Sequence, residues 1–392
     1  MTSELVIASS PHGICAGLLR DGRLIEFDLG DRDGLGDIHL GRVRKVAPEI
    51  DGAFVDCGLE ADALLGARDA RALSGARRGT SISRQVTEGQ AILVQLKRVA
   101  QADKGAKVGS DIALKGVLLV YRPRAKEVEL IGELAGSDHA EEQQARGKSL
   151  FPEGGFDLRA AAVDADDREL HNEADRLRQR WRVLEHRAAK TDPPARLEPE
   201  PDPLHALLLE RFSPRLDRII FAERTTLIRA RRWLEQSMPS WLVRNASRLE
   251  HLPEAFETTG VAAQLDEALG RTVALEGGGN LIIEPTAALT AIDVNGGGRG
   301  PLEVDLEAAR EIARQLRLRR LGGIVVVDFV DLPTKAERAR VVNELRQALA
   351  ADPTPTQLYP MSQLGLVELA RQRTGPSLDE YLGRLPGEEG SG

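Results

Sequence analysis

The 392-residue sequence contains few cysteines, few aromatic residues and no long hydrophobic run. Its two cysteines, Cys15 and Cys57, lack the spacing of a metal-binding motif, so we expect free thiols in a reducing environment. No apolar stretch approaches the roughly 18 residues that a membrane-spanning helix requires. The N-terminus, Met1-Thr-Ser-Glu, lacks the basic and apolar segments of a secretory signal. We therefore expect a cytoplasmic protein rather than a membrane-spanning or disulfide-rich secreted one.

The sequence also has no excess of positive charge. The net charge is −8, which argues against a uniformly basic nucleic-acid-binding surface but leaves room for local basic faces. Lysine is scarce, since 9 of the 53 basic residues are Lys and the other 44 are Arg. Arginine can bind phosphate in a bidentate geometry. The same bias also fits an Arg- and Ala-rich proteome, so it does not by itself indicate a ligand.

The common motifs of nucleotide hydrolysis, zinc binding and serine hydrolase chemistry are missing. The glycine run Gly296–Gly298 is not followed by Lys and Ser or Thr, so it is not a P-loop. The seven histidines are scattered and form neither a Cys/His cluster nor a Ser-His-Asp arrangement. We therefore reject ATP or GTP hydrolysis and expect no zinc.

The predicted elements indicate several mixed α and β domains rather than one core. Residues 5–29 form a predicted meander of three strands, with a hairpin turn at Asp21-Gly22. Five short strands with glycines at their corners, within residues 37–114, are typical of a small closed OB barrel. Residues 167–190 have the apolar spacing of a helix. The acidic, proline-rich segment Pro193–Pro203 indicates a linker or long loop.

The last predicted domain begins near Arg271. It contains a hairpin of residues 281–284 and 289–294, an amphipathic helix over 305–320, and a helix that opens with a capping box at Thr334. A final helical segment is predicted over Gly365–Arg373. Four arginines in the last turns of the first helix suit either the helix dipole or contact with phosphate: Arg314, Arg317, Arg319 and Arg320.

Two apolar strands of this domain end on aspartates, Asp293 and Asp328. Carboxylates at neighbouring strand ends, together with substrate phosphate oxygens, are typical ligands of Mg²⁺. The metal would polarise a phosphate and lower the pKa of a bound water. Asn295 points to the same side as Asp293 if the strand stays extended, and its amide would orient Asp293 or hold the phosphate. A single Asp closing a buried strand is more often a turn former or cap, so the residues alone leave that alternative open.

The barrel segment has the pattern G-x-V-x-x-V…G-A-F-V-D-x-G over residues 41–58. This pattern resembles the RNA-binding OB fold repeated in the largest protein of the small ribosomal subunit. Such barrels stack bases on aromatics beside a basic groove, which makes Phe54 the candidate stacking residue, with a core aromatic as the alternative. The candidate phosphate contacts, each with an ordinary solvated surface as its alternative, are Arg42, Arg44, Lys45, Lys97, Arg98, Lys104 and Lys107.

Several segments together resemble the catalytic half of the ribonuclease E/G family. They are Leu289-Thr-Ala-Ile-Asp-Val-Asn295, Glu307–Arg319, Leu321–Asp331 and Gly365–Arg373, the last followed by Pro376-Ser-Leu378. Their order and spacing match along the whole chain. The resemblance implies a multidomain α+β and α/β architecture, with an RNase H-like subdomain split in sequence, an inserted OB-fold barrel, a 5′-end sensor and a C-terminal DNase I-like catalytic domain.

The resemblance also implies domain bounds. The expected ranges are 1–35 and 204–270 for the two parts of the RNase H-like subdomain, 36–114 for the OB-fold RNA-binding domain, 115–203 for the sensor-like region with its helix and Pro-rich linker, 271–382 for the catalytic domain and 383–392 for a tail.

Residue roles follow from the resemblance in the same way. Asp293 and Asp328 would be magnesium ligands, with Asn295 assisting at the scissile phosphate. The implied RNA contacts are Phe54 for stacking, Arg98 and Lys104 for the backbone, and Arg159 for the 5′-monophosphate.

The sequence departs from the family pattern at three places. Ala160 stands where the sensor pocket usually has a threonine hydroxyl, so we expect a weaker preference for 5′-monophosphate ends. Leu64 replaces a second aromatic of the barrel, so we expect base stacking to rest on fewer rings. The chain stops at Gly392 without the family's C-P-x-C zinc-link motif, so we expect neither a zinc-linked dimer nor a scaffold tail for degradosome partners. The sequence leaves the oligomeric state open.

The function implied by the resemblance is a magnesium-dependent endoribonuclease that cuts single-stranded RNA in RNA processing and mRNA decay. The alternative is a non-catalytic RNA-binding protein on the same scaffold. The local residues do not exclude a third possibility, a nuclease that acts on DNA.

Overall fold

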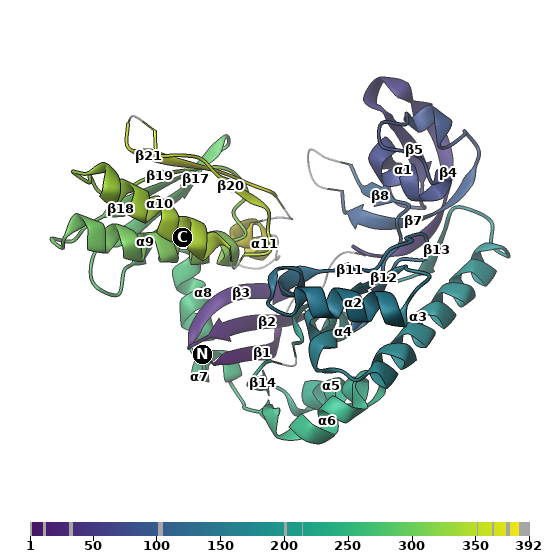
Figure 1. The fold of residues 1–392 in the computed structure, drawn as a ribbon, viewed down its shortest axis with the longest axis horizontal. Coiled ribbons are helices and arrows are strands. Elements are labelled where there is room, and N and C mark those ends of the chain that lie inside the picture. Colours follow the sequence, from purple (N-terminus) through teal and green to yellow (C-terminus); the bar gives the residue numbers. More distant parts are fainter. Residues whose placement is uncertain are drawn as a thin grey trace, which may run out of the picture. The chain divides into compact units, whose positions relative to one another are not determined.

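The computed structural model describes residues 2–10, 13–30, 34–100, 105–199, 202–213, 215–350, 352–362, 364–373 and 377–383. The fold is a mixture of helices and four β-sheets (Figure 1). The chain divides into two compact units, which are described separately. The first comprises Met1–Asp28, Leu216–Glu223 and Glu250–Gly392, and the second comprises Leu29–Arg215 and Arg224–Leu249.

The N-terminal meander forms the sheet β15-β14-β1-β2-β3. Strand β1 pairs antiparallel with β2 and parallel with β14, so segments about 200 residues apart in sequence share one sheet. The predicted hairpin turn is confirmed, since Asp21 and Gly22 both have positive φ (49° and 77°), as a tight turn between twisted strands requires. The strands are β1 Ser3–Ser10, β2 Gly13–Arg20, β3 Arg23–Leu29, β14 Arg218–Phe221 and β15 Leu249–His251.

The second unit contains the closed five-stranded barrel that the sequence predicts. Its strands follow the order β4-β5-β6-β8-β7, and β7 pairs back onto β4 to close the ring. Alternate side chains point into the barrel, where Val43, Val55, Leu65 and Val108 are almost fully buried. The elements are β4 Ile38–Ala47, η1 Pro48–Ile50, β5 Gly52–Asp56, β6 Ala63–Gly66, α1 Ala67–Ser74, η2 Ile82–Arg84, β7 Ala91–Arg98 and β8 Lys107–Gly109.

The prediction of a linker over Pro193–Pro203 is wrong for part of that segment. Ala195–Glu198 forms strand β13, which pairs antiparallel with β4 at the barrel's edge. Leu197 is only 2% exposed, so this strand is anchored by burial as well as by backbone hydrogen bonds. The prolines and acidic residues that flank the strand hide it in the sequence.

A small four-stranded sheet and several helices complete the second unit. The predicted helix over 167–190 is confirmed as α3, because the apolar stripe from Leu170 to Leu184 is buried and Asp166 and Glu169 form a capping box at its start. The strands are β9 Leu114–Lys115, β10 Leu119–Tyr121, β11 Glu129–Leu130 and β12 Phe156–Leu158. The helices are η3 Gly132–Gly136, α2 Ala140–Leu150, η4 Ala160–Asp164, α3 Asp167–Ala188, α4 Pro203–Arg211, α5 Arg224–Ser237, α6 Pro239–Asn245 and η5 Ala246–Arg248.

The C-terminal part of the first unit is a six-stranded sheet in the order β16-β17-β18-β19-β21-β20. Figure 1 shows α9 and α10 lying together on one face of this sheet, where both helices share a core with the buried strand residues. The predicted hairpin of β17 and β18 is confirmed, as is the capping box at Thr334. The elements are β16 Thr272–Ala274, β17 Asn280–Pro285, β18 Leu289–Asn295, α9 Pro301–Leu318, β19 Gly323–Asp328, α10 Lys335–Leu349, β20 Thr356–Leu358 and β21 Leu366–Arg371.

The prediction of a helix over Gly365–Arg373 is wrong. Residues Leu366–Arg371 form strand β21, which lies between β19 and β20 and runs antiparallel to both. Val367, Leu369 and Arg371 are buried while Glu368 is exposed, so the segment follows a period of two rather than the period of a helix.

The short helices α7 Ala255–Thr258 and α8 Val261–Leu269 lie in sequence between the two sheets of the first unit, and α11 Leu378–Gly383 follows the last strand. The arginines at the end of α9 contact strand β3. Arg314 donates to the Leu24 carbonyl at 2.6 Å, and Arg317 and Arg320 form ion pairs with Glu26 and Asp28. The predicted alternatives were the helix dipole and contact with phosphate; the structure instead shows these three side chains bonded to strand β3.

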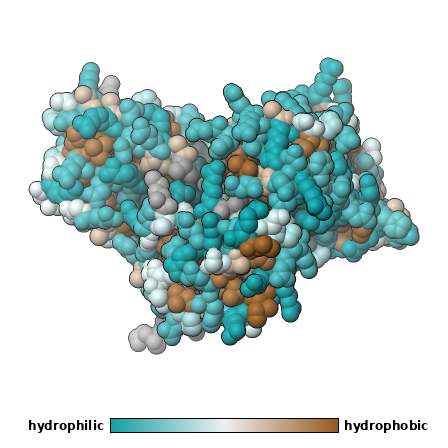
Figure 2. Space-filling view, turned by 60° about the horizontal axis from the view of Figure 1, so that its bottom comes forward, coloured by the Kyte–Doolittle hydropathy of each residue, from teal (hydrophilic) through white to brown (hydrophobic). Residues whose placement is uncertain are grey.

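One face of the molecule is mainly polar. Figure 2 shows a face on which hydrophilic side chains predominate and apolar side chains gather in small patches. Within the described residues, no helix is both long and apolar enough to cross a membrane.

We predict that Arg371→Leu lowers the free energy of unfolding by about 3–5 kcal/mol, because it leaves the buried Asp352 carboxylate unpaired. The Arg371 guanidinium donates twice to Asp352 Oδ2, at 2.7 and 3.0 Å, and both side chains are less than 5% exposed. Urea denaturation of the single variant and of Arg371→Leu/Asp352→Leu measures the effect. The double variant should regain a large part of the loss, and a double variant no more stable than the single one would contradict the prediction.

Candidate active site

The parallel pairing of β18 with β19 places Asp293 directly opposite Asp328. Neighbouring strands lie about 4.8 Å apart, so the two carboxylates start from adjacent backbone positions. Both residues are exposed, whereas the flanking Ile292, Val294 and Val327 are buried against α9 and α10. The carboxylates therefore project from the sheet face opposite the two helices.

Asn295 lies on the same face and contacts the first carboxylate. Its Nδ2 donates to Asp293 Oδ2 at 2.9 Å and lies 3.3 Å from Asn280 Oδ1. Asn280 is the residue directly opposite Asn295 in the β17–β18 hairpin, so the hairpin register brings the two amides together. The Asn295 amide thus orients one Asp293 oxygen and leaves the other available to a ligand. The sequence analysis did not predict Asn280 as a site residue. The one signal that could have found it is its position opposite Asn295 in the predicted hairpin.

The donor atoms at this site suit a hard cation. Mg²⁺ keeps several waters and is usually held by one or two carboxylates plus substrate phosphates. Two exposed carboxylates in register match that requirement, while a structural zinc site would need four nitrogen or sulfur ligands. Within the part of the chain that the structure describes, no group of three or more His, Cys, Asp or Glu residues is arranged to hold a metal.

Two glycine turns pack against each other beside Asn295. A β-carbon on Gly279 would lie 2.3 Å from the Asn295 carbonyl oxygen, and one on Gly297 would lie 2.6 Å from the Gly279 nitrogen. These two glycines therefore permit close backbone contact within the protein. Gly298 is different, because a β-carbon there would meet no atom within 4 Å.

Arg299 holds these turns to helix α9. Its guanidinium donates to Glu307 at 2.6 Å, to Glu303 at 2.7 Å and to the Gly278 carbonyl at 3.1 Å. Glu307 also accepts the N–H of Gly277 at 3.1 Å. The network fixes the backbone that follows Asn295.

Asp305 is a third carboxyl near the site, and sequence reasoning missed it. It lies on α9 and is fully buried, and its Oδ1 accepts the N–H of Val330 at 3.0 Å. Its Oδ2 is buried without a hydrogen-bond partner among the described residues. Burial raises the pKa of Asp305 to about 7, partly opposed by the Val330 hydrogen bond. A helical Asp normally indicates a solvated surface, so the sequence gives no sign of this environment.

The predicted stacking residue Phe54 lies half-buried on the outer side of the barrel. Its cross-strand neighbours are Lys45 on β4 and Leu64 on β6, and Leu64 in turn pairs with Lys107 on β8. This row of four residues combines an aromatic ring and an aliphatic side chain with a cation at each end. Lys107 also forms a 2.8 Å ion pair with Asp69.

The other predicted barrel contacts have different surroundings. Arg98 is partly buried and donates to the Gly105 carbonyl at 3.1 Å, while its Nε has no hydrogen-bond partner in the described residues. Arg44 pairs with Asp56 at 2.5 Å, and Arg42 donates to the Gly89 carbonyl. Lys104 lies outside the described residues.

The predicted sensor residue Arg159 follows strand β12 and donates to the Gly116 carbonyl at 2.7 Å. Burial lowers its pKa from the ordinary value. The buried Glu173 stabilises the turn that begins at Gly116. Its carboxylate accepts the backbone N–H groups of Val117, Leu118 and Leu119 at 2.7–2.9 Å. Gly116 also lines a cavity of about 190 Å³ with basic side chains that include Arg176 and Arg180. Arg159 thus bonds to the turn that lines this cavity.

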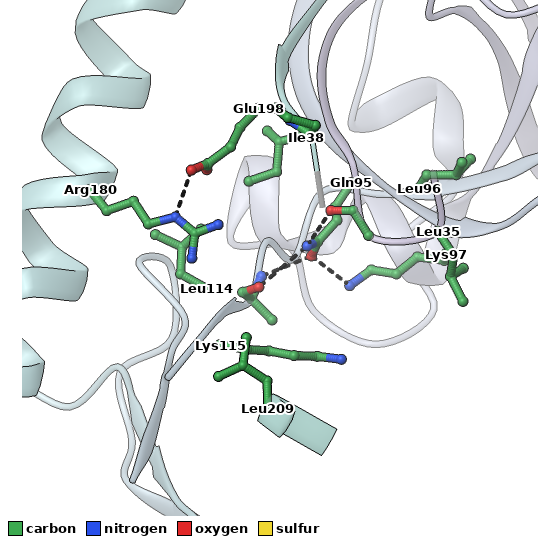
Figure 3. Close-up of a pocket in the computed structure, with 13 residues that line it drawn as sticks. Leu35, Ile38, Gln95, Leu96, Lys97, Leu114, Lys115, Arg180, Glu198 and Leu209 are labelled. Atoms are coloured by element: carbon green, nitrogen blue, oxygen red, sulfur yellow. Dashed lines mark hydrogen bonds and ion pairs between the residues drawn. The ribbon is translucent and has the colours of Figure 1, made fainter. Parts of the chain in front are cut away.

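A larger cavity of about 230 Å³ lies between the barrel, β9 and α3 (Figure 3). Gln95 at its centre bonds to Gly36, Ala113 and Lys97, and Arg180 donates to Glu198 at 2.7 Å. Glu198 Oε2 is buried without a hydrogen-bond partner among the described residues. The other polar groups named here bond to one another, and we assign no ligand to this cavity.

The exposed carboxylate pair and its neighbouring amide suit metal-assisted hydrolysis of a phosphate ester.

Comparison with known proteins identifies the family to which the chain belongs. The model of the "Ribonuclease E/G family" matches residues 113–374. The chain is 33% identical to ribonuclease G of Haemophilus influenzae over 97% of its own length and 81% of that protein, and 32% identical to ribonuclease G of Escherichia coli K12 over 97% and 82%. It is 31% identical to ribonuclease E of a Nostoc species over 99% of its length and 60% of that protein. The chain therefore belongs to the ribonuclease E/G family, as its sequence motifs predict.

We predict that Gly279→Ala destabilises the protein by at least about 2 kcal/mol more than Gly298→Ala. Both glycines have positive φ, +93° and +84°, so both variants incur backbone strain. Only Gly279→Ala adds a clash, with the Asn295 carbonyl. Chemical denaturation of the two variants measures the difference, and equal losses would show that the close contact is unimportant.

We predict that Asp305→Asn removes a pH dependence of stability. A carboxyl whose pKa is raised from 3.8 to about 7 by burial favours folding below pH 4, and this contribution is lost as pH rises to 7. The loss is at most about 4 kcal/mol, from roughly 1.4 kcal/mol per pH unit. Thermal and urea unfolding between pH 5 and 8 should show wild type losing more stability than Asp305→Asn. Parallel pH profiles would refute the prediction.

Proposed function

We propose that this protein is a magnesium-dependent endoribonuclease that cuts single-stranded RNA at the site formed by Asp293, Asn295 and Asp328. The observation that carries the proposal is the in-register pairing of the two aspartates on an exposed sheet face, with the Asn295 amide bonded to one of them. Membership of the ribonuclease E/G family supports it, since the matched relatives are named ribonuclease G and ribonuclease E.

The side chains of this site have distinct tasks in the proposed reaction. Asp293 and Asp328 would hold the cation. Bound Mg²⁺ supplies charge that polarises the scissile phosphate and lowers the pKa of a bound water. Asn295 fixes the orientation of Asp293 through the hydrogen bond from its Nδ2, and its Nδ2 is itself held by Asn280 Oδ1. The nearby Gly298 offers unobstructed backbone to an approaching chain.

The barrel supplies a second set of contacts in this proposal. Phe54 stacks on a base, and Lys45 and Lys107 at the ends of its cross-strand row lie on either side of the RNA backbone. Leu64 adds apolar contact but no π face, so we assign one stacked base to this row. Arg98 and Lys104 remain proposed backbone contacts on the basis of the family resemblance.

We further propose that the turn at Gly116 and Arg159 recognises the RNA 5′ end, with Ala160 omitting one hydrogen bond to its phosphate. The domain assignment is part of the same proposal. It consists of a split RNase H-like subdomain, an OB-fold barrel, a sensor region and a DNase I-like catalytic domain.

A cleavage assay tests the proposed activity. Purified protein is incubated with a 5′-monophosphorylated, labelled RNA oligonucleotide and with its DNA counterpart, with and without Mg²⁺. We expect cleavage of RNA alone, only with Mg²⁺, and a loss of about 10³-fold or more in Asp293→Asn and Asp328→Asn, because each removes a charged ligand. RNA binding without cleavage by wild type would support the non-catalytic alternative, and equal cleavage of DNA would support a general nuclease.

A second experiment tests 5′-end recognition. We predict that Ala160→Thr increases the preference for 5′-monophosphate over 5′-hydroxyl RNA by about 10-fold, the effect of one hydrogen bond to a charged group at about 1.5 kcal/mol. The ratio of kcat/KM for the two substrates is the measurement, and Ala160→Val is the control of similar shape without a hydroxyl. Unchanged discrimination in Ala160→Thr would contradict a sensor at this position.

A further inference from the structure

Asp305 is a buried carboxyl that the chemistry proposed above does not use. It lies in α9 on the covered face of the sheet and is 0% exposed. Its carboxylate accepts a hydrogen bond from outside the helix, from the backbone N–H of Val330 to Oδ1 at 3.0 Å. Val330 follows Asp328 by two residues, just beyond the end of β19.

Val330 also approaches the other strand of the site. Its Cγ2 would lie 3.8 Å from a β-carbon built on Gly296, which is ordinary van der Waals distance. Gly296 directly follows Asn295 at the end of β18. The hydrogen bond that Asp305 accepts therefore holds a residue that lies near the ends of both strands that carry the candidate catalytic side chains.

Packing does not explain a carboxyl at this position. Its second oxygen, Oδ2, is buried without a hydrogen-bond partner in the part of the chain that the structure describes. A buried polar atom without a partner costs about 1–3 kcal/mol, which an apolar side chain of similar size would avoid. The nearest neighbours on the same helix face, Val304 and Ala308, are fully buried and apolar. The feature that distinguishes Asp305 from them is the hydrogen bond to Val330.

We propose that Asp305 is a positioning residue for the carboxylate pair. By holding the Val330 backbone it keeps the end of β19 aligned with the end of β18, so that Asp328 stays opposite Asp293. This inference rests on the proposed function, because the alignment matters only if both carboxylates act on one ligand. Residues that orient metal ligands typically change metal affinity or activity by about 10–100-fold when they are replaced.

Two substitutions separate positioning from simple stability. Asp305→Asn keeps a carbonyl oxygen that can accept the Val330 N–H, whereas Asp305→Leu has a similar size and no acceptor. Gln315→Leu is the matched control. Gln315 is 1% exposed on the same helix, but its amide bonds to Glu311 and Arg319 rather than to the loop after Asp328.

Steady-state cleavage of a single-stranded RNA oligonucleotide is measured below the unfolding temperature of every variant. We expect Asp305→Leu to lower kcat by about 10–100-fold with little change in KM, and to raise the Mg²⁺ concentration for half-maximal activity. Asp305→Asn should stay within about 3-fold of wild type, because the hydrogen bond is kept. Gln315→Leu should lose stability without this loss of kcat.

Two further measurements do not depend on cleavage. Hydrogen exchange should show faster exchange of the segment around Val330 in Asp305→Leu than in Asp305→Asn, and binding of Mn²⁺ followed by electron paramagnetic resonance should weaken in the Leu variant alone. The inference is overturned if Asp305→Leu matches Gln315→Leu in kcat, or if its segment around Val330 exchanges like wild type. If wild type does not cleave RNA, the proposed function fails, and exchange and Mn²⁺ binding still decide whether Asp305 aligns the two carboxylates.

Discussion

The parallel pairing of β18 with β19 is the constraint on which the site depends. It brings together Asp293 and Asp328, which are 35 residues apart in sequence. Helix α9 crosses over between the two strands and packs on one face of the sheet, so the carboxylates are left on the other face. A shift of one residue in this register would turn one aspartate toward the core, where an unpaired charge is strongly unfavourable.

The surrounding contacts can be understood as supports for that register. Arg299 and Glu307 hold the turns beside Asn295, Asp305 holds the chain after Asp328, and the arginines at the end of α9 hold the helix against β3. Each support belongs to α9 or bonds to it. Helix α9 therefore holds the backbone at the ends of both strands. The geometry of the site depends on this one helix.

Much of this architecture could be predicted from sequence, because local patterns determine it. The spacing of apolar residues predicts α3, the Asp21-Gly22 pair predicts its hairpin, and strand ends predict the adjacency of the aspartates. Strands β13 and β21 were missed, because prolines flank the first and good helix formers such as Leu and Ala fill the second. Asp305 and Asn280 were missed because their surroundings come from residues distant in sequence, which no local pattern records.

The most direct test of the central idea, that Asp293 and Asp328 act together on one cation, is a double-mutant cycle. RNA cleavage rates are measured for Asp293→Asn, Asp328→Asn and the double variant at saturating Mg²⁺. Groups that act as a unit are strongly non-additive, so we expect the double variant to be no more than about 10-fold slower than either single variant. If the two losses instead multiply, the carboxylates act independently and the shared site is refuted.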